Sequence, residues 1–177
     1  MERTATPTVT PTSVGIRYGL IIGIVTIIYS FILKVANLEQ KPMMGLLTFA
    51  ILIGGIVVAH RYFKAQNGGF MSYGQGLGIA TVAGALIGAL SGIFQYIYVN
   101  FIDPQYIQRA LEAARAKLES DGNISDEQID QAMQWTEKMM PTGPLSIVWA
   151  ILATAFFGFL FSLIISAFTK NTRPEFE

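Results

Sequence analysis

The sequence has no cysteine and only one histidine among its 177 residues. Without cysteine the chain can hold neither a disulfide framework nor a thiolate metal site. Charge is scarce as well, because only 14% of the residues are charged, against about 25% in an ordinary soluble domain. The 12 basic residues are balanced by 12 acidic ones, so the chain lacks the basic excess that is typical of nucleic-acid-binding proteins. No nucleic acid is therefore expected as a partner.

What the sequence has instead is long hydrophobic runs, and 52% of its residues are hydrophobic. A helix needs about 20 apolar residues to cross the ~30 Å hydrocarbon core of a bilayer. Four runs of that length carry almost no charge, at about residues 16–35, 43–62, 76–99 and 145–168. We therefore predict an all-α fold, an integral membrane four-helix bundle whose membrane domain covers residues 14–170 and whose partners include membrane lipids. Residues 1–13, which are rich in Thr and Pro, are predicted to be a disordered tail, and residues 171–177 a second tail.

Basic residues near the ends of the four runs predict how the protein lies in its membrane. With four spans, both termini and the loop between the second and third spans share one side. Five basic residues lie close to the spans on that side and three on the other, namely Arg17, Arg61, Lys64, Lys170 and Arg173 against Lys34, Lys41 and Lys138. Because basic residues favour the cytoplasmic side, we predict a multi-pass protein of the inner (cytoplasmic) membrane with cytoplasmic termini.

The segment between the third and fourth runs, residues 103–143, differs in composition from the rest of the chain and holds eight of the 12 acidic residues. Apolar residues recur in it at helical spacing twice, with a glycine turn signal between the two stretches. Asp103 and Pro104 can cap and start the first helix, and Ser125 with Gln128 matches a capping box at the start of the second. We predict an extramembrane helical hairpin on the outer side of the membrane.

Trp135 and Met139 lie four residues apart in the second helix of this hairpin, so they share a face. The apolar residues of the hairpin could face each other, the membrane surface or another protein. Trp135 and Met139 are the candidate partner or membrane-interface contact, and residues 103–143 are the candidate binding region for a protein partner.

Small residues recur every four positions in the membrane runs, and they are the strongest mechanistic pattern in the sequence. In lipid, small side chains let helix backbones approach closely. One interpretation is packing within a single bundle, and the other is that Gly84, Gly88 and Gly92 form the seam of a homo-oligomer. The predicted helix-packing residues are Gly15, Gly19, Gly23, Gly54, Gly84, Gly88, Gly92 and Gly158.

Reactive groups are scarce inside the runs. Gln95 is the candidate intramembrane polar residue, and it is predicted to form a hydrogen bond between helices rather than to bind a substrate. His60 stands beside Arg61 at the end of a run and is predicted to be an interfacial polar cap. No Asp, Glu, Lys or Arg lies deep in a run, which argues against an ion-coupled transporter. Without paired titratable groups, we expect no enzymatic activity, no cofactor and no metal site.

Three segments carry a resemblance to a known family. They are Gly15-Ile16-Arg17-Tyr18-Gly19-Leu20-Ile21, residues 62–75 with the sequence YFKAQNGGFMSYGQ, and residues 96–104 with the sequence YIYVNFIDP. Over about residues 12–170 the chain resembles a bacterial family known as domain of unknown function 4199, found chiefly in Bacteroidetes. The middle segment is the most specific of the three. The resemblance implies a small inner-membrane protein with four spans and a helical insertion before the last, and it brings no known activity.

Two functional hypotheses follow from these patterns. The leading one is a non-enzymatic scaffold or accessory subunit that binds a partner through the outer hairpin. The alternative is a bundle that binds or transports a lipid or another small apolar molecule. An apolar cavity of several hundred Å³ that opens to the bilayer would favour the alternative, and a solid bundle would favour the scaffold.

Overall fold

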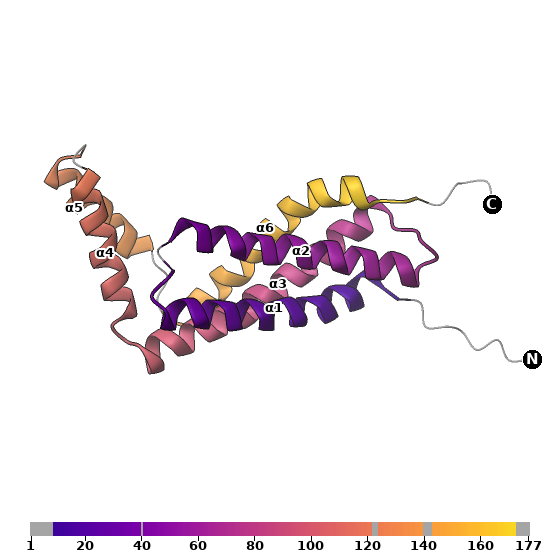
Figure 1. The fold of residues 1–177 in the computed structure, drawn as a ribbon, viewed down its shortest axis with the longest axis horizontal. Coiled ribbons are helices and arrows are strands. Elements are labelled where there is room, and N and C mark those ends of the chain that lie inside the picture. Colours follow the sequence, from indigo (N-terminus) through magenta and orange to yellow (C-terminus); the bar gives the residue numbers. More distant parts are fainter. Residues whose placement is uncertain (1–8, 40, 122–123, 140–142, 173–177) are drawn as a thin grey trace, which may run out of the picture. The chain divides into compact units, whose positions relative to one another are not determined.

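The computed structural model describes residues 9–39, 41–121, 124–139 and 143–172. The described residues form helices and no named strand, in the order α1 (Pro11–Val35), α2 (Pro42–Gln66), α3 (Tyr73–Ile97), the π-helical turn η1 (Tyr98–Ile102), α4 (Tyr106–Asp121), α5 (Asp126–Met139) and α6 (Leu145–Thr169) (Figure 1). They divide into two compact units, of which the first comprises residues 1–91 and 150–177 and the second residues 92–149. The all-α fold is thereby confirmed.

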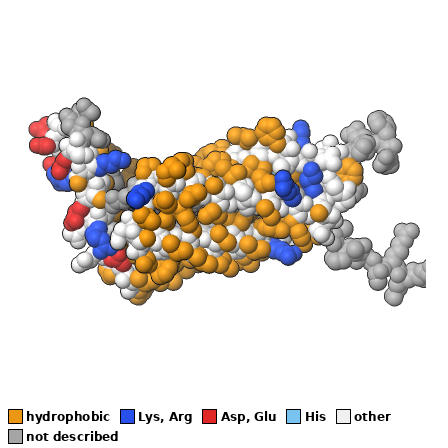
Figure 2. Space-filling view, viewed as in Figure 1, with side chains coloured by type: hydrophobic (Ala, Val, Ile, Leu, Met, Phe, Trp, Pro, Cys, Tyr) orange, Lys and Arg blue, Asp and Glu red, His pale blue; other side chains and the backbone are white. Residues whose placement is uncertain are grey.

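Four helices are long and apolar enough to cross a membrane: α1, α2, α3 with its continuation η1, and α6. Their outward surfaces are apolar, and residues such as Ile28, Phe156 and Ile164 are 55%, 58% and 64% exposed. Figure 2 shows hydrophobic side chains covering most of the visible face of these helices, whereas acidic side chains gather on α4 and α5. Surfaces of this kind are stable only in contact with lipid, so the chain is a membrane protein.

The first helix begins earlier than the sequence predicts. Thr10 is its N-cap, and the Thr10 side chain accepts a hydrogen bond from the backbone N–H of Ser13 while the Ser13 hydroxyl bonds the Thr10 backbone. Pro11 occupies the first helical position, where its missing N–H costs nothing. The predicted disordered tail of residues 1–13 is therefore wrong at its end, because 11–13 are helical. Residues 1–8 of that tail lie outside the described part of the chain.

The connection between α2 and α3 is a tight reversal that is tied to the end of α6. Gly68 and Gly69 have positive φ angles of 63° and 88°, which glycine adopts without the steric cost that a Cβ brings. Met71 then pairs with Asn171 through two backbone hydrogen bonds of 2.8 and 2.9 Å. The Asn171 side chain also donates to the Gly69 carbonyl. Asn171, predicted to begin a tail, is thus part of the folded unit, while 173–177 lie outside the described residues.

The interior of the first unit is mostly apolar, and Phe161 and Ile165 of α6 pack against it. One cluster of buried side chains comprises Val14, Ala59, Phe63, Met71 and Ile79, and a second comprises Ile22, Leu52, Ile56, Ala80 and Ile87. The helices α1, α2 and the parts of α3 and α6 that belong to this unit run alongside one another in Figure 1. The predicted four-helix bundle is confirmed.

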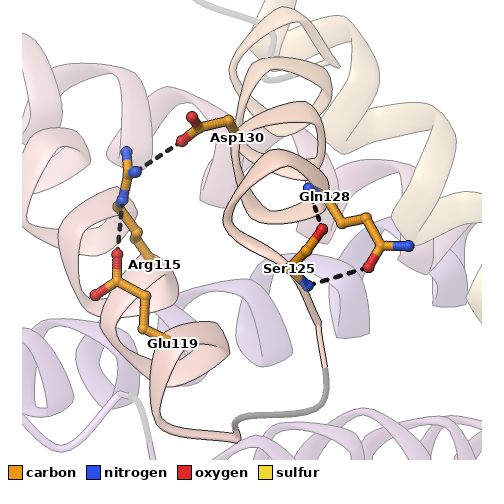
Figure 3. Close-up of polar contacts among 5 residues, drawn as sticks. All are labelled: Arg115, Glu119, Ser125, Gln128 and Asp130. Atoms are coloured by element: carbon orange, nitrogen blue, oxygen red, sulfur yellow. Dashed lines mark hydrogen bonds and ion pairs between the residues drawn. The ribbon is translucent and has the colours of Figure 1, made fainter.

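The second unit contains the predicted helical hairpin of α4 and α5. Helix α5 begins with the predicted capping box, in which Ser125 and Gln128 exchange hydrogen bonds between side chain and backbone (Figure 3). Helix α4 begins at Tyr106 rather than at Pro104, because the Asp103 carbonyl accepts the N–H of Tyr106 in a turn and the Asp103 carboxylate pairs with Arg109. Ile129 is buried, as the apolar spacing of the hairpin predicts.

Candidate functional site

The glycine row of α1 packs directly on the backbone of α3. A Cβ added to Gly15 would lie 2.9 Å from the carbonyl oxygen of Ile79, and one added to Gly19 would lie 3.0 Å from the Cα of Ala83. A Cβ on Gly23 would lie 2.7 Å from the Leu90 side chain. Real Cβ atoms rarely approach so closely, so Gly15 and Gly19 allow the backbones of α1 and α3 to meet, whereas Gly23 makes room for the Leu90 side chain.

A second glycine contact joins α3 to α6. Added Cβ atoms on Gly84 and Gly88 would lie 2.7 Å from the Thr154 carbonyl oxygen and 2.5 Å from that of Ala150. From the other side, a Cβ on Gly158 would lie 3.0 Å from the Ala80 carbonyl oxygen. The sequence predicted that Gly84, Gly88 and Gly92 could form a contact between two copies of the chain. At Gly84 and Gly88 this face is covered by α6 of the same chain. The structure favours packing within one bundle there.

One predicted packing glycine, Gly54, does not belong to these contacts, and the packing role of Gly92 stays a prediction. An added Cβ on Gly54 would meet no atom within 4 Å, whereas one on the adjacent Gly55 would collide with Ile22 of α1. The prediction for Gly54 is therefore corrected, because its neighbour makes the close contact between α2 and α1. Gly92 lies in α3 one turn beyond Gly88 and belongs to the second unit.

His60 lies at the centre of a buried polar cluster that joins α2, α3 and α6. Its side chain is 0% exposed. The Nε2 atom donates to the carbonyl oxygen of Gly76 at 3.0 Å, and Nδ1 forms a 3.0 Å hydrogen bond with the Thr169 hydroxyl. Because a carbonyl oxygen only accepts, Nε2 must carry a proton. The ring is enclosed by three helices, which its neighbours in the sequence do not predict, and the interfacial depth of His60 stays a prediction.

Two serines of α6 complete this cluster. The Ser162 hydroxyl donates to the Gly76 carbonyl at 3.2 Å and lies 2.9 Å from the Ser166 hydroxyl, and both serines are 0% exposed. Lys64 donates to the Thr169 carbonyl at the last turn of α6, where cations satisfy free carbonyl groups. Among the described residues no group of three His, Asp or Glu side chains could hold a metal ion. The cluster is suited to hold the ends of three helices together.

A cavity of about 230 Å³ lies between α1, α2, α3 and α6 within the first unit. Its walls are mostly apolar and include Phe49, Leu52, Ile87 and Phe157. Ser91 also lines it, and the Ser91 hydroxyl oxygen is buried with no hydrogen-bond partner. The bundle is therefore not completely solid.

The exposed face of the hairpin carries the two residues that the sequence singled out. Trp135 is 67% exposed and Met139 is 75% exposed, both on α5. Elsewhere the hairpin is held by charge, as Arg115 of α4 bonds Glu119 at 2.9 Å and Asp130 of α5 at 2.7 Å (Figure 3). The hydrogen bond to Glu119, together with the charge of Asp130, raises the pKa of Arg115. The hairpin thus presents large apolar side chains on a charged, solvent-compatible scaffold.

The comparison with protein families shows to which family the chain belongs. The model of the family described as "Protein of unknown function (DUF4199)" matches residues 17–171. The chain belongs to the DUF4199 family. Neither the comparison with curated proteins nor the comparison with solved structures found a match.

The region that matches the DUF4199 family covers nearly the whole fold described above. It begins at Arg17 in the first turns of α1 and ends at Asn171, which pairs with Met71. It therefore includes the glycine contact between α3 and α6, Gly19 and Gly23 of the contact between α1 and α3, the His60 cluster, the cavity and the hairpin. The resemblance inferred from the sequence is confirmed.

The remaining candidate, Gln95, is half-buried in α3. In the described part of the chain, no hydrogen bond joins its side chain to another residue, so its predicted interhelical bond is not found. The sequence reasoning placed Ser162 and Ser166 only in a row of small residues, and it missed Ser91 and Thr169. No short sequence signal marks these hydroxyls, because their surroundings are set by residues far away in the chain.

Proposed function

We propose that this DUF4199 protein is a non-enzymatic scaffold or accessory subunit of a bacterial inner membrane, and that it binds a partner protein through the α4–α5 hairpin. The observation that carries the proposal is the pair Trp135 and Met139. Large apolar side chains are unfavourable in water, and neighbouring exposed ones are typical of protein or membrane contacts. They lie on an element that is otherwise polar.

The charge of the hairpin favours a protein over the lipid surface as the occupant of this face. Residues 103–143 contain eight acidic and four basic residues, a net charge of −4. Bacterial and other cell membranes that carry anionic lipids repel such a segment, whereas they attract basic ones. We therefore infer a partner with a basic rim around an apolar pocket that receives Trp135.

Photo-crosslinking from this face tests the proposal. A photoreactive amino acid that replaces Trp135 or Met139 in the full chain, expressed in its membrane, is expected to give one discrete protein adduct that is identified by mass spectrometry. The same amino acid at Asp126, which is exposed and lies nine residues before Trp135 on the opposite face of α5, serves as the matched control and is expected to give far less of that adduct.

Two outcomes would contradict the partner hypothesis. Adducts with lipid alone from positions 135 and 139 would show that this face rests on the bilayer. Equal protein adducts from position 126 would show that the contact is not specific to the Trp135 face.

The proposed orientation, with cytoplasmic termini and an outer hairpin, has its own test. Because the chain contains no cysteine, single cysteines placed at Ser120 in α4 and at Ala65 in α2 can be labelled without background. In intact cells we expect a membrane-impermeant maleimide to label Ser120→Cys nearly completely and Ala65→Cys only after the membrane is permeabilised. The reverse pattern would place the hairpin in the cytoplasm.

The cavity supports a second candidate function, the binding of a lipid or another small apolar molecule. Its walls are apolar, and Phe49 and Phe157 at its edge are 43% and 45% exposed on the surface that faces lipid. A volume of about 230 Å³ is below that of a typical drug-sized pocket, which starts at about 300 Å³. A slender apolar ligand fits these dimensions better than a bulky one.

A further inference from the structure

The two helices of the hairpin form an open groove of about 530 Å³ that is lined by α4 and α5 alone. Its lining runs from Gln108 to Arg115 on α4 and from Asp130 to Glu137 on α5. On each helix the lining residues are spaced i, i+3, i+4 and i+7, so they share one face and form a stripe two turns long. The groove is therefore long enough to receive about two turns of a third helix.

The middle of the groove is apolar and only partly covered. Leu111 of α4 and Met133 of α5 stand in the middle of the two stripes, and both are half-buried. Ile129, one turn before Met133, is by contrast 2% exposed. A helix laid in the groove would remove from water the apolar surface that Leu111 and Met133 still expose, which favours binding.

The charge around this apolar centre is negative. Glu112 and Glu137 line the groove, one from each helix, and both are exposed. Within the described part of the chain, neither forms a salt bridge. Arg115 is the basic residue of the lining, and its guanidinium is already bonded to Glu119 and Asp130 (Figure 3). The groove therefore offers two carboxylates that can pair with an incoming cation.

Three other occupants fit this groove less well than a basic helix does. The described residues contain no group of three His, Asp or Glu side chains that could hold a metal ion. A second copy of the chain would bring an equally negative groove to a two-fold interface, and the like charges would repel. Carboxylates also repel anionic lipid headgroups. In a basic helix, by contrast, the methylene stems of Lys and Arg cover apolar surface while their charged ends reach the carboxylates.

We propose that the groove between α4 and α5 binds a basic amphipathic helix of another protein. Apolar side chains of that helix pack on Leu111 and Met133, and its Lys or Arg side chains pair with Glu112 and Glu137. The groove is distinct from the Trp135 face, because two residues separate Met133 from Trp135 and place them about 200° apart around α5. The inference therefore goes beyond the proposed Trp135 contact and does not depend on it.

Photo-crosslinking from the groove tests the proposal in the full chain in its own membrane. A photoreactive amino acid replaces Gln108, which is exposed and lines the groove. Mass spectrometry of the attached peptide is expected to show another protein, with Lys or Arg beside apolar residues that recur at helical spacing. The same amino acid at Lys117, which is exposed on the opposite side of α4 nine residues later, should give far less of that adduct.

Several results from position 108 would overturn the proposal. They are the absence of a protein adduct, an adduct with a second copy of this chain, and an attached peptide without basic residues. A groove adduct that forms while positions 135 and 139 capture only lipid would support the groove and refute the Trp135 contact. The two proposals can therefore fail separately.

The role of the carboxylates is tested with a synthetic peptide of the crosslinked sequence, titrated onto the full chain in phosphatidylcholine nanodiscs. Empty nanodiscs measure its binding to lipid. Glu137→Gln should weaken the binding about two- to fivefold, the range of one exposed ion pair, and added salt should weaken it further. Glu127→Gln removes the same charge from an exposed position that does not line the groove, about 15 Å away along α5, and should have no effect. Equal affinities of the two variants would overturn the pairing.

The apolar centre has its own variants in the same titration. Met133→Gln keeps the length of the side chain but removes its apolar character, and it should weaken binding about five- to tenfold. Trp135→Gln, on the other side of α5, should leave the affinity unchanged. Leu111→Gln provides a second test from α4 if Met133→Gln lowers the helix content. Wild-type affinity of both Met133→Gln and Leu111→Gln, each with wild-type far-UV circular dichroism, would overturn the proposal.

Discussion

Gly88→Ala is expected to destabilise the bundle by about 2 kcal/mol, although it adds a single methyl group. The new Cβ would lie 2.5 Å from the carbonyl oxygen of Ala150 and 2.7 Å from the Cα of Ile151. Both are backbone atoms, so only a separation of α3 from α6 can relieve the collision. Overpacking of this kind costs about 1–3 kcal/mol, and it outweighs the helix propensity that alanine gains over glycine, at most about 1 kcal/mol. Gly88→Leu should prevent the two helices from packing at all.

Gly78→Ala in the same helix is the matched control, because an added Cβ there meets no atom within 4 Å. It should leave stability unchanged or raise it by up to about 1 kcal/mol. The unfolding free energy is measured by titrating the detergent-solubilised protein with SDS and following its near-UV circular dichroism. If both alanine variants unfold at the same SDS fraction, the close contact between α3 and α6 is wrong.

His60→Ala is expected to lower the free energy of unfolding by about 3 kcal/mol. The substitution removes the hydrogen bonds to Gly76 and Thr169 and leaves a cavity where a completely buried ring stood. Neither partner is left without a bond, since Ser162 still donates to the Gly76 carbonyl and the Thr169 hydroxyl still donates to Ile165. The loss should therefore stay below that of a substitution that leaves buried groups unpaired.

A glutamine at this position distinguishes hydrogen bonding from shape. The amide of His60→Gln can still donate to the Gly76 carbonyl, so this variant should recover about half of the stability that alanine loses. Arg61→Ala, at the exposed neighbouring position, should change stability by less than about 0.5 kcal/mol. The SDS titration provides the measurement again. A wild-type midpoint for His60→Ala would mean that the cluster does not hold the helix ends together.

The features that the sequence predicted well are those that depend on short stretches of chain. A run of about 20 apolar residues is nearly sufficient for a membrane-spanning helix, and the four such runs became α1, α2, α3 and α6. The capping box of α5 depends on Ser125 and Gln128, which are three residues apart. The wrong start of α1 also has a local cause. Thr10 and Ser13 form a recognisable cap, but the segment was assigned to a disordered tail because it is rich in Thr and Pro.

The features that the sequence could not predict depend on distant partners. His60 bonds Gly76 and Thr169, which lie 16 and 109 residues away, so its neighbours in the sequence gave no sign of burial. Gly54 and Gly55 match a small-residue row equally well, and only the rotation of α2 against α1 decides that Gly55 makes the contact. The cavity is formed by four helices. The sequence did not predict it, and a cavity entered only as the observation that would favour lipid binding over a scaffold.

The hydrogen bond between His60 of α2 and Thr169 at the end of α6 can form only after α6 has been synthesised, so it sets an order of assembly. The 109 residues that separate His60 from Thr169 take roughly 5 to 20 s to synthesise at ~5–20 residues per second. Within that interval α3 is completed at Ile97, and from then on α1 can dock on α3 through Gly15 and Gly19 while α6 is still to be made. The faces of Gly84 and Gly88, and the bonding groups of His60 and Gly76, meanwhile have no α6 to cover them. The nascent three-helix intermediate is therefore the form of this protein most open to misassembly, and the form on which a membrane chaperone would act.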